Sequence, residues 1–148
     1  MYLRISSPQA QLYEGEIEKL TIPTEIGEIT ILPDHEPLAS VVVPGVLRIT
    51  PAQVPEDTWY VIDQGTIAIA VSRGLLVVDG AKIIVTTTAA TKSPKESEEV
   101  LETMKKEMQI KLEAIRTDGN QQDIDEAMMN VEKINADLRL SKLQRVTR

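Results

Sequence analysis

The only histidine of the chain, His35, lies in the run ILPDHEPL between Asp34 and Glu36, with a proline on either side of the three. A histidine beside two carboxylates could act as a general base or as part of a metal site. A zinc site needs three or four ligands, usually with further histidines or cysteines, and the chain has no cysteine. A catalytic base needs a nucleophile or a second group to orient it. The residues therefore favour a rigid structural loop, or a loop presented to a partner, over catalysis or metal binding.

A second candidate site is a set of cations at the end of the chain. They recur every three residues, with no acidic residue among the last ten, and are Arg139, Lys142, Arg145 and Arg148. Cations at a helix C-terminus complement the helix dipole, at about 0.3 to 1 kcal/mol each. The same spacing would also form a basic strip that binds an acidic surface. The residues alone slightly favour a solvated helix face.

Composition limits the classes of function. The chain has 148 residues and a formal net charge of -7, and it has no basic patch large enough to follow a nucleic acid backbone. Without cysteine there is no disulfide framework and no thiolate chemistry. The N-terminus does not resemble a signal peptide, and no apolar run approaches the roughly 20 residues that span a bilayer. We therefore expect a cytoplasmic protein that binds no nucleic acid and uses no cofactor.

Residues 1–90 consist of short β-branched runs separated by proline, glycine and acidic residues, such as IEKLTI, VLRIT and KIIVTTT. Many strands at such close spacing are typical of antiparallel sandwiches and barrels. Asp79 and Gly80 give the strongest hairpin signal, because tight hairpin turns need positive φ values. The sequence predicts an antiparallel β-sandwich domain over these residues.

In the remaining part of the chain, the spacing of apolar residues changes from every second residue to about every 3.6 residues, the period of an α-helix. A capping box from Ser93 to Glu96 predicts a helix over residues 94–115. Turn-forming residues follow, and a second amphipathic helix is expected from about Ile124. Two such helices joined by a short polar loop fold back on each other. The sequence therefore predicts an α+β protein in which an antiparallel two-helix hairpin domain occupies residues 91–148.

Three stretches carry a family resemblance in the same order and at nearly the same spacing. They are the turn EIGE at residues 25–28, the loop ILPDHEPL at 31–38 and the strand PGVLRI at 44–49. These resemble a Gly-Glu turn, a Pro-Gly-His-Ala-Pro-Leu loop and a Pro-Gly-Val-x-Arg-Ile strand in the epsilon subunit of the F-type (rotary, proton-translocating) ATP synthase. With the helical hairpin, the resemblance covers nearly the whole chain.

This resemblance implies a noncatalytic rotor subunit of the central stalk, peripheral to the cytoplasmic side of the cell membrane. It implies that the sandwich binds the gamma subunit and the c-subunit ring through the two loops, at Glu28, Asp34, His35 and Glu36. It also implies that the hairpin either folds on the sandwich or extends to the alpha/beta catalytic hexamer and inhibits ATP hydrolysis. The residues expected to meet the hexamer are Arg139, Lys142, Arg145 and Arg148.

The chain departs from the family pattern at several places. Many bacterial members carry Ile/Leu-Asp-x-x-Arg-Ala at the start of the first C-terminal helix, where the arginine helps to bind ATP. In the aligned residues 94–99, Glu98 takes the position of that arginine. The stretch between Ile49 and Ser72 is several residues longer than usual. The alternative interpretation is a free-standing β-sandwich adaptor whose helices recognise another helical partner, and an independent enzyme comes third.

Overall fold

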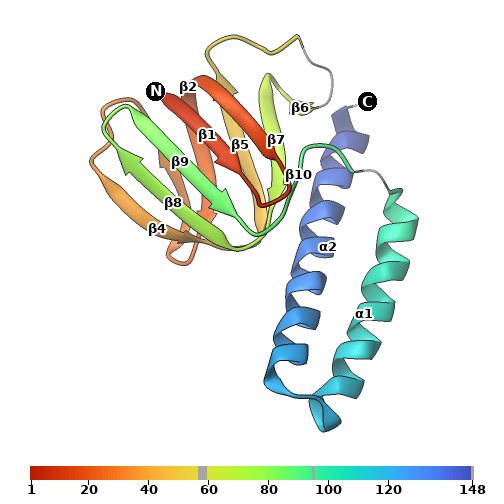
Figure 1. Ribbon diagram of the computed structural model, residues 1–148. Helices are drawn as coiled ribbons and strands as arrows, with labels where there is room; N and C mark the ends of the chain where they lie inside the picture. Colours follow the sequence, from red (N-terminus) through yellow and green to blue (C-terminus); the bar gives the residue numbers. More distant parts are fainter. Residues whose placement is uncertain (57–59, 95, 148) are drawn as a thin grey trace.

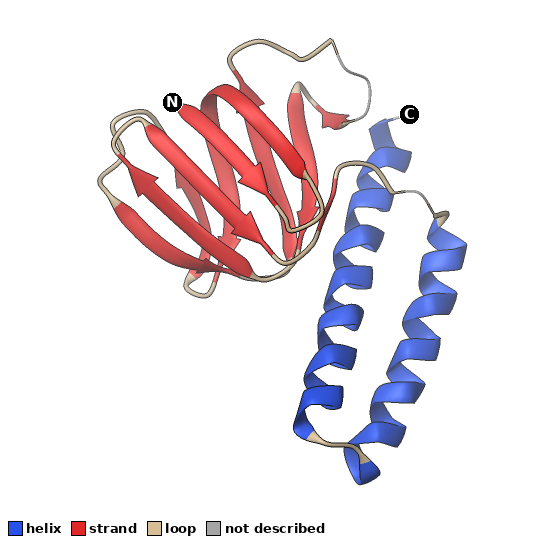
Figure 2. Cartoon of the chain, viewed as in Figure 1, coloured by secondary structure: helices blue, strands red, loops and turns tan. Residues whose placement is uncertain are grey.

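The computed structural model describes residues 1–56, 60–94 and 96–147, without the side chains of Asp118 and residues 145–147. Strands fill the N-terminal part of these residues, and two long helices follow at one side (Figure 1, Figure 2). The strands are β1 (Tyr2–Ser6), β2 (Gln11–Thr24), β3 (Gly27–Ile31), β4 (Leu38–Val42), β5 (Gly45–Pro51), β6 (Val61–Asp63), β7 (Thr66–Val71), β8 (Gly74–Asp79), β9 (Lys82–Thr87) and β10 (Ala90–Thr91). The helices are α1 (Glu98–Asp118) and α2 (Gln121–Thr147). This order confirms the predicted β-sandwich followed by a helical hairpin.

The long strand β2 joins the two layers of the sandwich. Its first half pairs with β1, where Glu16 lies opposite Tyr2, and its second half pairs with β5, where Leu20 lies opposite Ile49. The hydrogen-bonded order is β1-β9-β8-β4-β2-β5-β7-β10, and Figure 1 shows β8 and β9 in one layer and β5 and β7 in the other. One pair departs from the antiparallel prediction, because β1 and β9 run parallel. These two strands are distant in sequence and no hairpin joins them, so nothing forces them to be antiparallel.

The core between the layers is built from isoleucine, leucine and valine side chains. Leu3, Ile22 and Leu47 are fully buried there. In β7 the larger side chains of Ile67 and Ile69 point into this core, whereas its alanines belong to a second apolar cluster on the opposite face. The sandwich core includes no residue of α1 or α2. Burial of this apolar surface, at about 25 cal/mol per Å², therefore stabilises the sandwich without the helices.

The predicted hairpin turn after Asp79 is confirmed, and a second tight turn lies between β6 and β7. Gly80 has a φ of 59° and is the first of the two residues that join β8 to β9. Gln64 and Gly65 have φ values of 51° and 77° and join β6 to β7. Positive φ at the turn positions matches the right-handed twist of the flanking strands. The turns thus fix the register of both hairpins.

The start of the first helix differs from the prediction. Ser97, not Ser93, is the N-cap, and its hydroxyl accepts a hydrogen bond of 3.3 Å from the backbone N–H of Val100. Two glutamates follow in the first turn of α1, where carboxylates favour the helix dipole. The second helix begins at Gln121, because the Asn120 side chain accepts a hydrogen bond of 2.9 Å from the N–H of Asp123. Each helix starts directly after the residue whose side chain caps it.

The hairpin lies against the sandwich mainly through α2, and α1 packs on the outer side of α2 (Figure 1). Leu140 and Ala136 of α2 close over a small apolar surface of the sandwich made by Val61, Ala68 and Ala70. A separate cluster, Leu101, Ile134 and Leu138 with Met108 beside it, joins the two helices. The turn between the helices extends well beyond the sandwich (Figure 1). The hairpin therefore has its own internal contacts and a limited docking surface.

Candidate partner-binding surfaces

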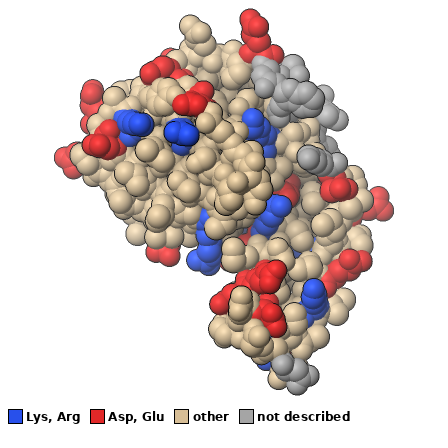
Figure 3. Space-filling view, viewed as in Figure 1, with Lys and Arg blue, Asp and Glu red and all other residues tan. Residues whose placement is uncertain are grey.

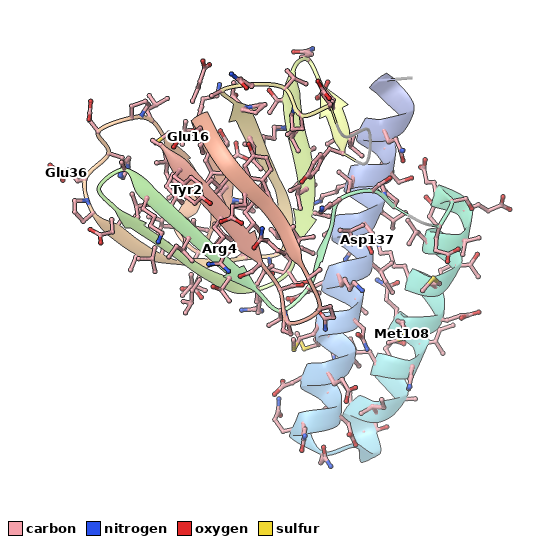
Figure 4. All side chains as sticks on the ribbon, turned by 45° about the horizontal axis from the view of Figure 1, so that its top comes forward. Tyr2, Arg4, Glu16, Glu36, Met108 and Asp137 are labelled. Carbon is pink, nitrogen blue, oxygen red and sulfur yellow. The ribbon has the colours of Figure 1, made fainter. Side chains whose placement is uncertain are left out.

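The histidine loop joins β3 to β4 at the end of the sandwich farthest from the helices, where Figure 4 shows Glu36 pointing outward. The N–H of His35 donates to the carbonyl of Leu32 at 3.2 Å, which closes a tight turn. Asp34 occupies the third position of this turn with a φ of 66°. Glycine adopts that conformation without strain, and the resembled family has glycine at this position. The turn geometry is therefore kept although the residue has changed.

The side chain of His35 is held by its own loop. Its Nδ1 lies 2.7 Å from the carbonyl oxygen of Glu36, a distance at which Nδ1–H donates. Asp34 and Glu36 are exposed, and their carboxylates make no hydrogen bond to the imidazole. Among the described residues, no three histidine, aspartate or glutamate side chains are placed to hold a metal ion. The loop presents one fixed ring between two exposed carboxylates.

Glu28 is exposed near the start of β3, just after the β2–β3 turn, while residues 34–36 follow the other end of that strand. At about 3.3 Å per residue, the strand separates Glu28 from Leu32 by about 13 Å. A partner must span this length to touch both. Each end also carries an exposed apolar residue, because Ile26 is 79% and Leu32 is 52% exposed. Neither residue was predicted from the sequence, although an isoleucine or leucine within a turn can indicate an exposed apolar contact.

The four C-terminal cations are only partly described. Arg139 is exposed and lies over Gly45 at the start of β5, and Lys142 is exposed one turn later. The side chain of Arg145 and all of Arg148 lie outside the described residues. Farther along α2 toward its N-terminus, the guanidinium of Arg73 on the sandwich pairs with Glu132 at 3.3 Å. Figure 3 shows that acidic and basic side chains are interspersed along the visible side of the helices.

The longer stretch after β5 packs on β2 and on the linker before α1. The hydroxyl of Tyr60 donates to the carbonyl of Leu12 at 2.8 Å, and its ring meets that of Tyr13 edge to face at 6.1 Å between centroids. The ammonium of Lys92 in the linker lies 5.0 Å from the centroid of the Tyr60 ring, which is cation–π distance. The extra residues therefore connect the sandwich to the segment that leads into the hairpin.

The chain combines a β-sandwich with a docked helical hairpin, and its distinctive features are exposed loop and helix surfaces. This is the architecture of a protein-binding subunit. Residues 1–93 match the family described as ATP synthase, Delta/Epsilon chain, beta-sandwich domain. The chain belongs to the ATP synthase delta/epsilon chain family. No helix in the described ranges is both long enough and apolar enough to cross a membrane.

Relatives support this assignment along most of the chain. The ATP synthase epsilon chain of Laribacter hongkongensis is 36% identical over 118 residues, which are 80% of this chain and 78% of that one. The epsilon chain of Neisseria gonorrhoeae is 37% identical over 93 residues, covering 63% of this chain and 60% of that one.

Solved structures share the fold. One chain of the Euglena gracilis mitochondrial ATP synthase OSCP/F1/c-ring structure superposes with a TM-score of 0.66 at 17% identity, covering 90% of this chain and 76% of that one. A chain from the Tetrahymena thermophila mitochondrial ATP synthase central stalk and c-ring structure has a TM-score of 0.52 at 16% identity, covering 100% and 96%.

Proposed function

We propose that this chain is a noncatalytic rotor subunit that couples the gamma subunit of an F-type ATP synthase to its c ring and carries a movable inhibitory hairpin. The observation that carries the proposal is the family match over residues 1–93, together with 36% identity to an ATP synthase epsilon chain. The structural neighbours, by their titles, come from F1/c-ring and central stalk assemblies. Such a subunit transmits force through its contacts and needs no catalytic group.

In this proposal the sandwich binds gamma and the c ring through both ends of β3. Glu28 supplies one contact, and Asp34, His35 and Glu36 supply the other. The support is geometric, since both places combine exposed carboxylates with an exposed apolar side chain, Ile26 or Leu32. Protein interfaces commonly place charged groups around such an apolar contact. Held by the c ring, the protein would lie peripherally on the cytoplasmic side of the cell membrane.

The two helices of the hairpin domain predicted over residues 91–148 would move as a unit against the sandwich domain predicted over residues 1–90, while Thr91 stays paired with β7 as part of β10. The division is supported by the separate apolar clusters, because the sandwich core holds no helical residue and the two helices share a cluster of their own. A small apolar surface around Leu140 and the Arg73–Glu132 ion pair are among the contacts that join them. A switch of this kind requires two packings of similar free energy, within a few kcal/mol. The lifted hairpin would contact the alpha/beta hexamer and inhibit ATP hydrolysis.

The assembly itself is the direct test. The tagged chain should co-purify with the native ATP synthase, and the purified chain should co-elute with purified gamma in gel filtration. A chain that stays monomeric beside folded gamma would contradict the proposal and favour a free-standing adaptor.

Replacing His35 with alanine should weaken binding to gamma or the c ring by several-fold, because the ring fixed against Glu36 is lost from the contact. The melting temperature should stay nearly unchanged, since the loop is exposed and lies outside the core. Binding is measured by titration of gamma, alone and with the c ring. Gln122→Ala, an exposed change at the far end of the hairpin, serves as the control. Equal affinities of the two variants for gamma and the c ring would show that His35 is not part of the interface.

Changing Arg139, Lys142 and Arg145 together to alanine should raise ATP hydrolysis by the assembled enzyme modestly. Exposed ion pairs contribute only about 0 to 1 kcal/mol each, so single changes should do little. Three together would shift the hairpin equilibrium by a measurable factor. Salt should reproduce part of the effect, since charges are screened over roughly 8 to 10 Å at physiological ionic strength. Hydrolysis that responds neither to the triple change nor to salt would exclude a charge-guided contact.

A further inference from the structure

A cavity of about 650 Å³ lies where the hairpin meets the sandwich. Its walls come from α2, the first turn of α1, the strand β10 with the linker after it, and the β1–β2 connection. Asp137 projects into it from α2, on the side that faces the linker (Figure 4). The adjacent Ala136 belongs to the docking surface and Leu138 belongs to the cluster between the helices. Asp137 therefore lies between the contact that holds α2 on the sandwich and the contact that joins the two helices.

The carboxylate of Asp137 is incompletely satisfied. Its Oδ1 is buried and has no hydrogen-bond partner, and Thr91 of β10 lines the same cavity. Burial raises the pKa of Asp137, and the nearby Thr91 hydroxyl and the charge of Lys133 only partly offset that rise. A buried carboxylate that lacks partners costs free energy when ionised, and protonation removes that cost.

The charged groups around Asp137 are few. Lys133 stands one turn earlier on α2, and Lys92 and Glu96 come from the linker. Lys92 is directed to the Tyr60 ring, and Glu96 carries the same charge as Asp137. The β1–β2 connection, β10 and α1 contribute only uncharged side chains to the cavity among the described residues. No lysine or arginine of the described ranges forms an ion pair with Asp137.

We propose that docking of the hairpin is coupled to protonation of Asp137, so that the docked hairpin binds a proton at this carboxylate and the lifted hairpin releases it to water. The proposal rests on the proposed movement of the hairpin and adds its control by pH. In the lifted state α2 leaves Thr91 and the linker, and Asp137 becomes an ordinary exposed carboxylate. Hairpin release then yields a carboxylate and a hydrated proton.

The direction of the pH effect follows from linkage. Docking gains from Asp137 protonation at low pH, and that gain is lost as pH rises toward and through the docked-state pKa, which burial raises. Between the pKa values of the lifted and docked states, the ratio of lifted to docked hairpins should rise by at most about tenfold per pH unit. Outside that window Asp137 should contribute no pH dependence. An alkaline shift therefore favours the lifted hairpin.

The chain has no cysteine, so a single introduced thiol reports on docking. Ala70→Cys places the thiol on β7 beneath Leu140, where a thiol reagent reaches it only when the hairpin lifts. Val85→Cys, in the sandwich core, reports on opening of the sandwich itself. The rate at each pH is divided by the rate for an unfolded peptide, which corrects for thiol ionisation. The normalised Ala70→Cys rate should rise with pH through the Asp137 window, and the Val85→Cys rate should not.

Asp137→Asn should remove this rise and slow the labelling of Ala70→Cys at neutral pH, because the neutral amide mimics the protonated acid. Asp125→Asn is the matched control, since Asp125 is exposed on the same helix and bonds only to Gln121 one turn earlier. It should leave the pH dependence intact. In the unmodified chain, the carboxyl carbon of Asp137 should titrate at higher pH in an NMR experiment than the same carbon in an unfolded peptide with the sequence around Asp137.

The outcomes separate the two proposals. If Ala70→Cys never reacts faster than Val85→Cys, the hairpin does not lift independently, and the movable hairpin of the proposed function fails. If Ala70→Cys reacts faster but Asp137→Asn keeps the same pH dependence as the parent chain, the hairpin lifts and only the coupling to Asp137 is overturned. Titration of Asp137 at the same pH as in the unfolded peptide would also overturn it.

Discussion

Removal of the hairpin by truncation after Ser93 is expected to raise ATP hydrolysis by the assembled ATP synthase several-fold, because the element proposed to inhibit the hexamer is gone. The cut keeps β10, whose Ala90 and Thr91 pair with Val71 and Ala70 of β7. It removes no residue of the sandwich core. The truncated chain should therefore stay folded and bound to gamma. The measurement is the hydrolysis rate of complexes that contain the truncated or the full-length chain.

Two controls make this experiment decisive. Circular dichroism and gel filtration with gamma should show that the truncated sandwich is folded and assembled, since loss of the subunit would also change hydrolysis. Rates should be compared at low and high salt and over a range of ATP concentrations. Indistinguishable rates for the two complexes under all these conditions would mean that the hairpin is structural and that no inhibition occurs.

Replacing Leu140 with alanine is expected to release the hairpin from the sandwich. Leu140 is fully buried and is the α2 leucine at the centre of the docking cluster, whereas Leu143 is only partly buried against it. Truncation of a buried leucine costs about 2 to 5 kcal/mol. Since about 1.4 kcal/mol is a tenfold change in population, the lifted fraction should rise by a factor of about 30 or more. Hydrogen exchange should show lower protection of α2 amides and unchanged protection in β1, β8 and β9.

Met129→Ala is the control for this variant, because Met129 lies on α2 but is 40% exposed. It should leave amide protection of α2 nearly unchanged. In the assembled enzyme Leu140→Ala should lower hydrolysis, the opposite of truncation, since a released hairpin is available to the hexamer. A parallel loss of protection in the sandwich strands would show that the hairpin and the sandwich unfold together.

Much of the fold was predictable because short local patterns in the sequence determine it. Alternating β-branched runs and the Asp79-Gly80 turn give a sandwich, and the change of apolar period gives a hairpin. The first helix was placed wrongly because Ser93, with Glu96 three residues later, has the capping-box pattern, whereas Val100 lies three residues after the true N-cap, Ser97. Only packing decides between them. Ser97 has acidic residues directly after it, whereas Ser93 stays in the linker beside the cavity.

The candidate sites were less predictable. The exposure of the histidine loop follows from its prolines and acids, but the distance from Glu28 depends on the length of β3. Asp137 resembles any solvated helical carboxylate in the sequence, and its burial arises from three elements that meet only in the fold. The one pattern that indicates its burial is its position between Ala136, which contacts the sandwich, and Leu138, which contacts α1.

The small side chains on the outer face of β7 have a consequence for the life of the protein in the cell. If α2 leaves, the sandwich exposes the side chain of Val61 and the methyl groups of Ala68 and Ala70, while the bulky Leu140 departs with the helix. β7 remains hydrogen-bonded to β5 on one side and to β6 and β10 on the other, so β7 itself gains no open edge. A small apolar surface on a paired strand is a poor template for aggregation. A lifted hairpin would thus leave a sandwich with little tendency to adhere to its neighbours.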